Sequence, residues 1–390
     1  MARAREAPIR ATAISQPGAG NDDLSRDVYC VLGMPIDNID FATALRRIEQ
    51  AAKGQAPFLL STPNLNFLVN AHASPEFRDS LLLSDLCPPD GVAILWLARL
   101  LGVPIKQRVA GSDLFEALKH KRPNQPLRVF LFGGEAGIAQ AAAAEFNASG
   151  IVCVGTFYPG FGSVEEMSRE DILGRINSSN AQFLVVSLGA VKGQSWLLRN
   201  HSSLRIPVRS HLGAVMNFQA GTIKRAPPNW RRLGVEWLWR IKEEPYLWSR
   251  YAHDGLTLLR LLLTRIVPLR VDDLWLRARG EFNKPELTAV EQNNHDAITL
   301  RLNGVATAKN IDQVRAGFAK ALGAYKNVIL DLSELRVMDA RALGLLLMLR
   351  KQLQSRGLDL QLVGMNRRLK KTLRLQGLDF LLSCSPPARI

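Results

Sequence analysis

Between residues 28 and 220 the chain alternates short, almost continuously apolar runs with segments of helical periodicity. The apolar runs lie at 28–36, 58–62, 128–134, 151–157 and 183–190. A strand without a polar face is buried on both sides, and a helix between successive strands supplies the crossover that parallel strands need. The pattern therefore predicts an α/β domain over 28–220, built on a mainly parallel sheet with helices on both faces.

Three short polar motifs adjoin apolar runs of this domain. They are Ser61-Thr62-Pro63-Asn64, Pro89-Asp90-Gly91 and Gly111-Ser112-Asp113. Ligands of open α/β sheets bind beside loops of this kind. Asp90 matters most, because the proline and glycine around it define its backbone tightly, as suits a positioned base. Ordinary turns use the same residue types, so both interpretations stay open at this point.

The chain is strongly basic, with a net charge of +15 and a pI of about 10.0. This excess predicts an anionic partner: nucleic acid, an acidic membrane surface or a phosphorylated ligand. The sequence has no helix-turn-helix, zinc-finger or basic–aromatic single-strand pattern, which argues against nucleic acid. The four cysteines and six histidines lack metal-binding spacings, and there is no Asp-x-Asp motif, so we expect no metal cofactor.

The first 27 residues contain scattered arginines but no continuous apolar core of a signal peptide. We therefore expect residues 1–27 to form a disordered arm, with an organellar transit peptide as the minor alternative. No run of about 18 uncharged apolar residues occurs, so no segment is expected to span a membrane.

Residues 221–279 are rich in tryptophan and in basic residues. Five of the seven tryptophans lie here, and residues 256–267 have an amphipathic helical pattern. Arginine and tryptophan beside an apolar face suit a helix that lies in the interface of an anionic membrane. A helical hairpin packed on the sheet, with arginines extended towards solvent, explains the pattern equally well.

A second α/β pattern follows an expected linker at 280–295. Its apolar strands are predicted at 298–304, 327–333 and 359–365, with helical segments between them. About 100 residues suffice for an independent domain, which we expect over 296–385.

Glycines follow two of the predicted strands. Gly133 and Gly134 open a helix whose free N–H groups would favour a phosphate, although their spacing departs from the dinucleotide-binding fingerprint. Simple strand–helix turns would use the same glycines. After the later strand come Gly189, Lys192 and Gln194, where Lys192 could neutralise a phosphate and Gln194 could bind a sugar hydroxyl. An exposed lysine at a helix start is the plainer alternative.

The motifs, in order, resemble the WecG/TagA/CpsF glycosyltransferases (glycosyltransferase family 26) over about residues 28–255. The matching residues are Thr62-Pro63-Asn64, Pro89-Asp90-Gly91, Arg108 with Gly111-Ser112-Asp113, Phe132-Gly133-Gly134, Gly189 with Lys192 and Trp196, Phe218-x-Ala-Gly221, Lys224-Arg225-Ala226-Pro227, Arg232-Leu233-Gly234-x-Glu236-Trp237 and Glu244-Pro245.

The resemblance implies a Rossmann-like fold with a helical C-terminal appendage that meets the membrane. Such bacterial enzymes move a sugar from a UDP-sugar to a polyprenyl-diphosphate-linked glycan, with inversion and without a metal. By position, Asp90 is expected to be the base, with Thr62 and Asn64 in the same pocket. Arg225 and Arg232 would stabilise the leaving UDP. The remaining expected substrate-binding residues are Arg108, Gly111, Ser112, Asp113, Gly133, Gly134, Gly189, Lys192 and Gln194.

Two motifs depart from the family pattern. The usual Pro-Lys-Gln-Glu is here Val191-Lys192-Gly193-Gln194, and the usual Phe-Asp-Phe is Met216-Asn217-Phe218. Both changes remove polar or charged groups near the expected donor site, so the sequence does not predict which sugar is bound.

The second domain resembles a STAS domain through Asp331-Leu332-Ser333, Val337-Met338-Asp339 and Leu343-Gly344-Leu345. The family often carries a phosphorylated Ser or Thr where this chain has Asp339-Ala340-Arg341-Ala342. A phosphorylation switch is therefore not expected there, whereas docking on a protein partner or oligomerisation remains open.

We accordingly predict an inverting, UDP-sugar-dependent glycosyltransferase of cell-surface or exopolysaccharide synthesis, bound to the inner face of the cytoplasmic membrane. The alternative is a regulatory scaffold that binds a nucleotide-sugar without turnover and recruits a partner through its STAS-like domain. A nucleic-acid-binding role would rest on charge alone.

Overall fold

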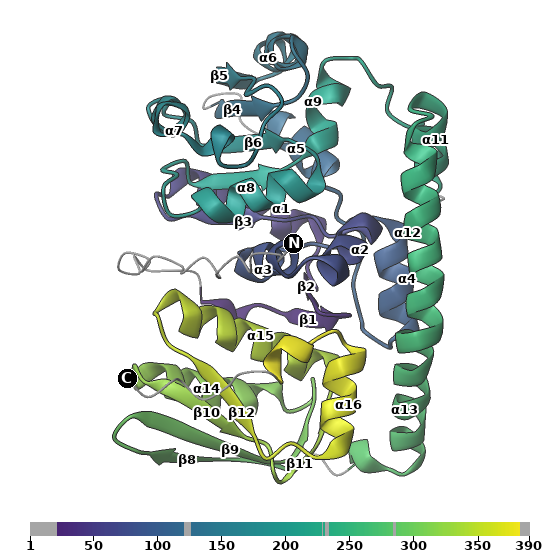
Figure 1. Cartoon of the computed structure of the whole chain (residues 1–390), viewed down its shortest axis with the longest axis vertical. Helices are drawn as coiled ribbons and strands as arrows, with labels where there is room; N and C mark the ends of the chain where they lie inside the picture. Colours follow the sequence, from purple (N-terminus) through teal and green to yellow (C-terminus); the bar gives the residue numbers. More distant parts are fainter. Residues whose placement is uncertain (1–21, 121–125, 228, 231–233, 284–285, 383–390) are drawn as a thin grey trace, which may run out of the picture.

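The computed structural model describes residues 22–120, 126–227, 229–230, 234–283 and 286–382. Two α/β bodies are stacked along the long axis of the molecule (Figure 1). A layer made of a hairpin and helices lies between them, and a column of helices runs along one side.

The upper body in Figure 1 is built on a five-stranded, wholly parallel sheet. Its strands are β3 (Phe58–Leu60), β4 (Leu127–Gly133), β5 (Ile151–Phe157), β6 (Phe183–Ser187) and β7 (Val208–His211). They lie in the order β3-β7-β6-β4-β5. The predicted α/β domain with a parallel sheet is therefore confirmed.

Helices cover both faces of this sheet. The helices that share a core with one face are α1 (Phe41–Lys53), α5 (Gly111–His120), α6 (Ile138–Ala148) and α9 (Gly213–Gln219). The elements on the other face are α7 (Glu170–Asn177), α8 (Ala190–Asn200) and the 3₁₀ turn η2 (Glu166–Ser168). On that face Trp196 is fully buried and stacks on Phe132, with ring centroids 4.4 Å apart. Because both faces are covered, the central strands carry apolar residues on both sides.

The apolar run at 28–36, predicted as one strand, is instead an antiparallel hairpin of β1 (Val28–Val31) and β2 (Met34–Asp37). Its two-residue turn places Leu32 and Gly33 at positive φ, +48° and +84°. The hairpin lies outside the main sheet and packs with α2 (Leu65–Ala73), α3 (Pro75–Leu83) and α4 (Val92–Leu100). Every residue of both strands is buried, which is why the run has no polar alternation.

The residues predicted as a basic, tryptophan-rich appendage form the helical column. Its elements are α11 (Glu236–Glu243), α12 (Leu247–Leu261), the π-helical turn η3 (Leu262–Ile266) and α13 (Val267–Ala278). Leu261 and Ile266 are buried against the hairpin layer, whereas Leu259 and Leu263 are 53% and 65% exposed. The column therefore packs along one side and leaves an apolar side open to solvent.

The lower body contains a second five-stranded sheet. Its strands are β8 (Leu287–Asn293), β9 (Ala297–Ala306), β10 (Asn327–Asp331), β11 (Leu335–Met338) and β12 (Leu360–Val363). They follow the order β11-β9-β10-β12, with β8 antiparallel to β9. The other elements are α14 (Ile311–Gly323), α15 (Ala340–Ser355), α16 (Arg367–Leu375), η4 (Glu281–Asn283) and η5 (Asp379–Leu381). The predicted linker at 280–295 is thus wrong for 287–293, because these residues pair with β9.

The core of the lower body extends into the hairpin layer. Val28 and Cys30 of β1 cluster with the buried side of α15. A Cβ added to Gly344 of α15 would lie 2.1 Å from the Val28 carbonyl oxygen, so helix and hairpin are in direct backbone contact. The prediction that the disordered arm extends to residue 27 is also wrong, since η1 (Asp23–Ser25) is docked here. The rest of that arm, 1–21, lies outside the described residues.

Candidate active site

The predicted polar motifs converge along the carboxyl edge of the parallel sheet. The Ser61–Asn64 motif continues from β3, Gly133 ends β4, and Gly189 follows β6. The chain runs from β4 to β5 in one direction and from β6 to β7 in the other, so the strand order reverses between β4 and β6. Ligands of open α/β sheets bind in the crevice at such a switch point. A ligand is therefore expected next to these glycines.

The glycines at this crevice have different structural roles. Gly133, at φ +98°, lies against β6, and a Cβ there would meet the Ser187 carbonyl oxygen at 2.3 Å. Gly134 donates its N–H to the same carbonyl at 2.7 Å. Gly189 caps α8 at φ +79°, and no atom lies within 4 Å of a Cβ built on it. Packing of β4 against β6 therefore explains Gly133, while Gly189 leaves space at a helix N-terminus that favours anions.

Asp90 lies on a loop that is tied to both neighbouring polar motifs. Its backbone N–H donates to the Pro63 carbonyl at 2.8 Å, and the Pro89 carbonyl accepts from the Val109 N–H at 2.8 Å. Gly91, at φ +89°, turns the chain into α4. Three motifs that are separated in sequence are thus held together around one carboxyl group.

The surroundings of Asp90 give it the proton affinity of a general base. Burial raises the pKa of Asp90 to about 7, although the Arg108 cation and the Gly111 N–H, 3.4 Å from Oδ2, act in the opposite direction. The residue keeps some exposure to solvent. A carboxyl group with this pKa is ionised in about half of the molecules at pH 7 and accepts a proton more readily than an ordinary aspartate.

Thr62 and Asn64 lie beside the Asp90 loop, as predicted from the motifs. Thr62 is buried, and its Cγ2 lies 3.0 Å from a Cβ built on Gly111. Asn64 caps α2 by accepting from the Phe67 N–H at 3.1 Å, and its Cβ lies 3.6 Å from a Cβ built on Gly91. The helix cap fixes the orientation of the Asn64 side chain beside the Asp90 loop.

Two arginines converge on Asp113 at the start of α5. Arg108 lies 3.4 Å from an Asp113 carboxylate oxygen and 3.4 Å from Glu236 of α11. Arg225 forms an ion pair with Asp113 and donates to the Ser112 hydroxyl at 3.0 Å. Ser112 and Asp113, predicted to bind substrate, therefore orient the two arginines in this structure. Glu236 belongs to the same network through its contact with Arg108.

Lys192 and Gln194 each bind another part of the chain. The Lys192 ammonium donates to the Gly162 carbonyl at 2.8 Å. Gln194 is fully buried and donates to the Ser61 hydroxyl at 3.1 Å. The prediction that Gln194 binds a sugar hydroxyl is therefore wrong, because its amide supports the Thr62 loop from the interior.

Arg232, predicted to stabilise the leaving group, lies outside the described residues. Within the described part of the chain, no group of three or more His, Cys, Asp or Glu side chains is placed to hold a metal ion. Metal-independent chemistry stays a prediction.

Comparison with known proteins identifies the family. The glycosyl transferase WecG/TagA/CpsF family matches residues 29–271, more than half of the chain. The chain belongs to this family. A Mlab STAS domain matches residues 289–383. One relative is the N-acetylglucosaminyldiphosphoundecaprenol N-acetyl-beta-D-mannosaminyltransferase of Bacillus spizizenii, 26% identical over 231 residues, which are 55% of this chain and 85% of that protein.

As a WecG/TagA/CpsF member, the first domain is a glycosyltransferase, and its departure at Gly193 has a structural counterpart. A Cβ on Gly193 would lie 2.3 Å from Cδ2 of His211, so the imidazole fills the space where a longer side chain would begin. Burial lowers the pKa of His211 to about 4, so the ring is neutral at pH 7. Its Nε2 is buried without a partner among the described residues.

Sequence reasoning did not assign His211 or Glu236 to the site of this glycosyltransferase. Glu236 stands in one of the matching motifs, and an acidic residue in this basic stretch was the available signal. His211 ends β7, a four-residue strand that also carries Arg209 and Ser210. Because the strand has little apolar content, the sequence pattern did not reveal it.

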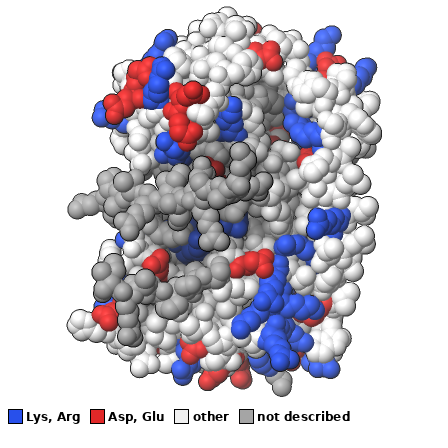
Figure 2. All heavy atoms as spheres, in the orientation of Figure 1, with Lys and Arg blue, Asp and Glu red and all other residues white. Residues whose placement is uncertain are grey.

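The appendage of this family member exposes an apolar stripe along α12 and α13. Its exposed members are Leu256, Leu259, Leu263, Val267, Val271 and Leu274. Figure 2 shows Lys and Arg side chains gathered over α16, which contacts α13 through the 3.6 Å pair of Lys371 with Asp272. No described helix is both long and apolar enough to cross a bilayer.

Proposed function

We propose that this glycosyltransferase moves a sugar from a UDP-sugar to an acceptor sugar on a polyprenyl diphosphate, with inversion at the anomeric carbon. The relative from Bacillus spizizenii is named for N-acetylmannosaminyl transfer to such a lipid-linked acceptor, which supports an N-acetylhexosaminyl donor. The observation that carries the proposal is the Asp90 carboxyl, with a pKa of about 7, on a loop bonded to the loop that follows β3 of the parallel sheet.

The reaction is a single displacement. The acceptor hydroxyl oxygen forms a bond to the anomeric carbon while the bond from that carbon to the UDP oxygen breaks. Asp90 takes the hydroxyl proton, and the electron pair of the broken bond leaves on the diphosphate. Thr62 and Asn64 orient the acceptor beside Asp90, because both lie against the loops that carry it.

The charge on the departing diphosphate is balanced by arginine. Arg225 lies on the stretch that precedes Pro227, is partly exposed, and has its Nε buried without a partner among the described residues. Guanidinium groups bind phosphates through several parallel N–H donors. Arg108 and Arg232 would add charge, so no metal ion is required for the leaving group.

The acceptor is reached from an anionic membrane surface. The apolar stripe of α12 and α13 would enter the interfacial region, and the basic residues of α16 would face acidic headgroups at its border. Both features are typical of helices that bind in the plane of a membrane. This placement supports synthesis of a cell-envelope polymer from the cytoplasmic side.

The test is Asp90→Asn in the full-length protein, assayed for UDP release with a panel of UDP-sugars and a polyprenyl-diphosphate-linked N-acetylglucosamine. Loss of the base should lower turnover on the order of 10²–10⁴-fold. Asp312→Asn is the matched control, because Asp312 is a surface residue of α14 with its side chain 79% exposed. Turnover of Asp90→Asn close to that of the wild type would refute the assignment. Donor binding without UDP release by the wild type would instead support a scaffold.

A further inference from the structure

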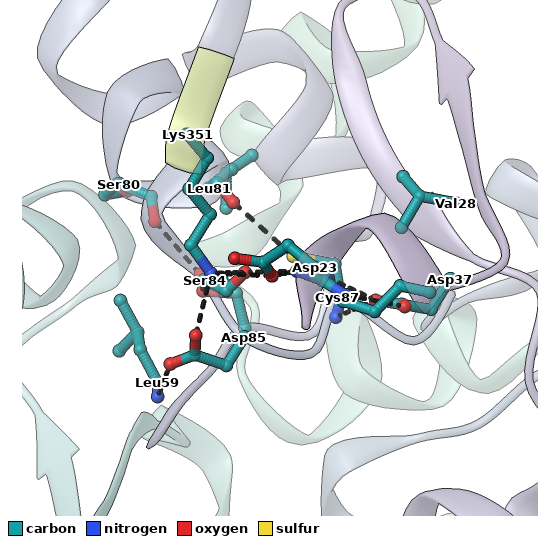
Figure 3. Close-up of polar contacts among 12 residues, drawn as sticks. Asp23, Val28, Asp37, Leu59, Ser80, Leu81, Ser84, Asp85, Cys87 and Lys351 are labelled. Carbon is teal, nitrogen blue, oxygen red and sulfur yellow. Dashed lines mark hydrogen bonds and ion pairs between the residues drawn. The ribbon is translucent and has the colours of Figure 1, made fainter. Parts of the chain in front are cut away.

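A lysine of the STAS-like domain reaches into the glycosyltransferase domain. Lys351, on α15, is 9% exposed in its side chain. Its ammonium lies 2.7 Å from Asp85 Oδ1, 3.0 Å from Asp23 Oδ1 and 3.2 Å from the Ser84 carbonyl oxygen. Figure 3 shows this side chain extending from α15 to meet all three groups.

Asp85 also binds the backbone of β3, a strand of the catalytic sheet. Its second oxygen, Oδ2, accepts from the Leu59 N–H at 2.8 Å, and its own N–H donates to the Leu59 carbonyl at 2.8 Å. Burial alone would raise the pKa of Asp85, but the Lys351 ammonium and the Leu59 amide hold it below its usual range. The carboxylate is thus ionised and joins Lys351 to β3.

A second cation holds the same stretch of chain from the other side. Arg26, fully buried, donates to the Ser84 carbonyl at 2.9 Å and pairs with Asp37 at 2.7 Å. Asp37 in turn accepts from the Cys87 N–H at 2.6 Å. Residues 84–87 are therefore fixed at both ends by buried, charge-assisted hydrogen bonds, which are stronger than neutral ones.

The fixed stretch leads directly to the catalytic groups. Ser61 donates its N–H to the Leu86 carbonyl at 3.0 Å, and the Asp90 N–H donates to the Pro63 carbonyl at 2.8 Å. The segments 59–63 and 85–90 therefore run side by side from the Lys351 contact to the pocket. One segment carries Thr62 and the other carries Asp90.

We propose that Lys351 is a positioning residue for sugar transfer: by joining the STAS-like domain to Asp85, it sets the relative placement of Thr62 and Asp90. The partner that this domain docks on is then the chain's own catalytic domain. The inference rests on the proposed function of Asp90. Catalytic rates are sensitive to small displacements, since a misplacement of about 1 Å can cost about 10²-fold.

The test compares Lys351→Met with Lys320→Met in the full chain. Lys320 is a lysine of α14 in the same domain, with its side chain 72% exposed and paired with Glu291 of β8. Hydrogen exchange of the backbone amides in 58–64 and 84–90 is measured by mass spectrometry. We expect Lys351→Met to speed exchange at Leu59 about tenfold, as loss of one charge-assisted hydrogen bond implies, and Lys320→Met to leave it unchanged.

Steady-state kinetics supply the second readout. Lys351→Met should lower kcat at least about tenfold while the donor KM stays within about twofold, because Lys351 does not face the substrate. Unchanged exchange at 58–64 and 84–90, or unchanged kcat in a folded variant, would overturn the proposal. If the wild type shows no turnover, the proposed function fails, and the exchange data still decide whether Lys351 orders these segments.

A double variant keeps the test decisive if Lys351→Met folds poorly. Lys351→Met/Asp85→Asn removes both charges, so no carboxylate of Asp85 is left buried and unpaired, and the asparagine oxygen still accepts from Leu59. We expect slower exchange at Leu59 in the double variant than in Lys351→Met. Equal exchange in the two would show that Asp85 does not transmit the contact and would contradict the proposal.

Discussion

The charge of Arg108 should set the pH at which this glycosyltransferase becomes active. The proposed base Asp90 can accept a proton only when it is ionised, so kcat/KM should fall tenfold for each pH unit below the pKa of about 7. Arg108 lowers this pKa, while Glu236 and Asp113 raise it. Removing the guanidinium takes away this cation and breaks its ion pair with Glu236, while Asp113 keeps its pair with Arg225. The loss of the cation shifts the Asp90 pKa upward.

The expected size of this shift follows from the loss of one nearby cation, about one pH unit or more. With the pKa at about 8 instead of 7, the ionised fraction of Asp90 at pH 7 falls from about half to about a tenth. Arg108→Met should therefore reduce kcat/KM about fivefold more at pH 7 than at pH 9.5. The measurement is UDP release between pH 5.5 and 9.5 with a fixed donor and acceptor.

Arg108→Lys is the matched control, because it keeps the positive charge and loses only the planar hydrogen-bonding group. Its midpoint should stay near that of the wild type, whatever happens to its plateau rate. A wild-type profile without a limb near pH 7, or an Arg108→Met midpoint equal to that of the wild type, would refute the assignment of the limb to Asp90.

Two further predictions concern stability and membrane binding. Asp90→Asn should raise the melting temperature at pH 8 and leave it unchanged at pH 4. The pKa of Asp90 is about 7 in the folded protein, against the ordinary value of 3.8 that applies to the unfolded chain. The folded state therefore loses stability as the pH rises from about 4 to 7, by up to about 4 kcal/mol. Leu259→Ser combined with Leu263→Ser should weaken binding to phosphatidylglycerol vesicles at least about tenfold in a sedimentation assay, since both side chains are more than half exposed. Unchanged sedimentation would leave the stripe without a membrane role.

Local patterns sufficed to predict the parallel sheet and the gathering of its motifs. Strands buried on both faces carry continuous apolar runs, and their carboxyl ends meet by topology. The expectation that Thr62 and Asp90 lie in one pocket came from the family resemblance. Local patterns could not predict the two arginines at Asp113. Their ion pairs depend on side chains from α5, α11 and the 221–227 stretch together.

Long-range contacts explain the errors. The run at 28–36 has the composition of a central strand because α15, more than 300 residues later, covers it. Residues 287–293 alternate polar and apolar weakly and pair as an edge strand, so they were mistaken for a linker. Gln194 is polar but buried, since its partner Ser61 comes from a distant loop. None of these three features leaves a local signal.

The packing of β1 on α15 implies that the two sequence domains unfold as one cooperative unit, and Gly344 offers a direct test. A Cβ at this position would lie 2.1 Å from the Val28 carbonyl oxygen and 3.0 Å from the Tyr29 Cα, so Gly344→Ala must push α15 away from the hairpin. Gly317→Ala in α14 is the matched control: its Cβ would find only ordinary contacts, the nearest at 3.4 Å, and alanine favours the helix by about 1 kcal/mol.

We expect Gly344→Ala to destabilise the whole chain by about 1–3 kcal/mol, the usual cost of overpacking, and Gly317→Ala to be neutral or stabilising. If the domains are one unit, calorimetry shows a single transition in the wild type that moves to lower temperature, and melting of the catalytic sheet moves with it. Two separate transitions, with only the STAS-like one shifted by Gly344→Ala, would mean that the interface contributes little. The hairpin would then be a passive neighbour of α15 rather than the element that joins its stability to the pocket of Asp90.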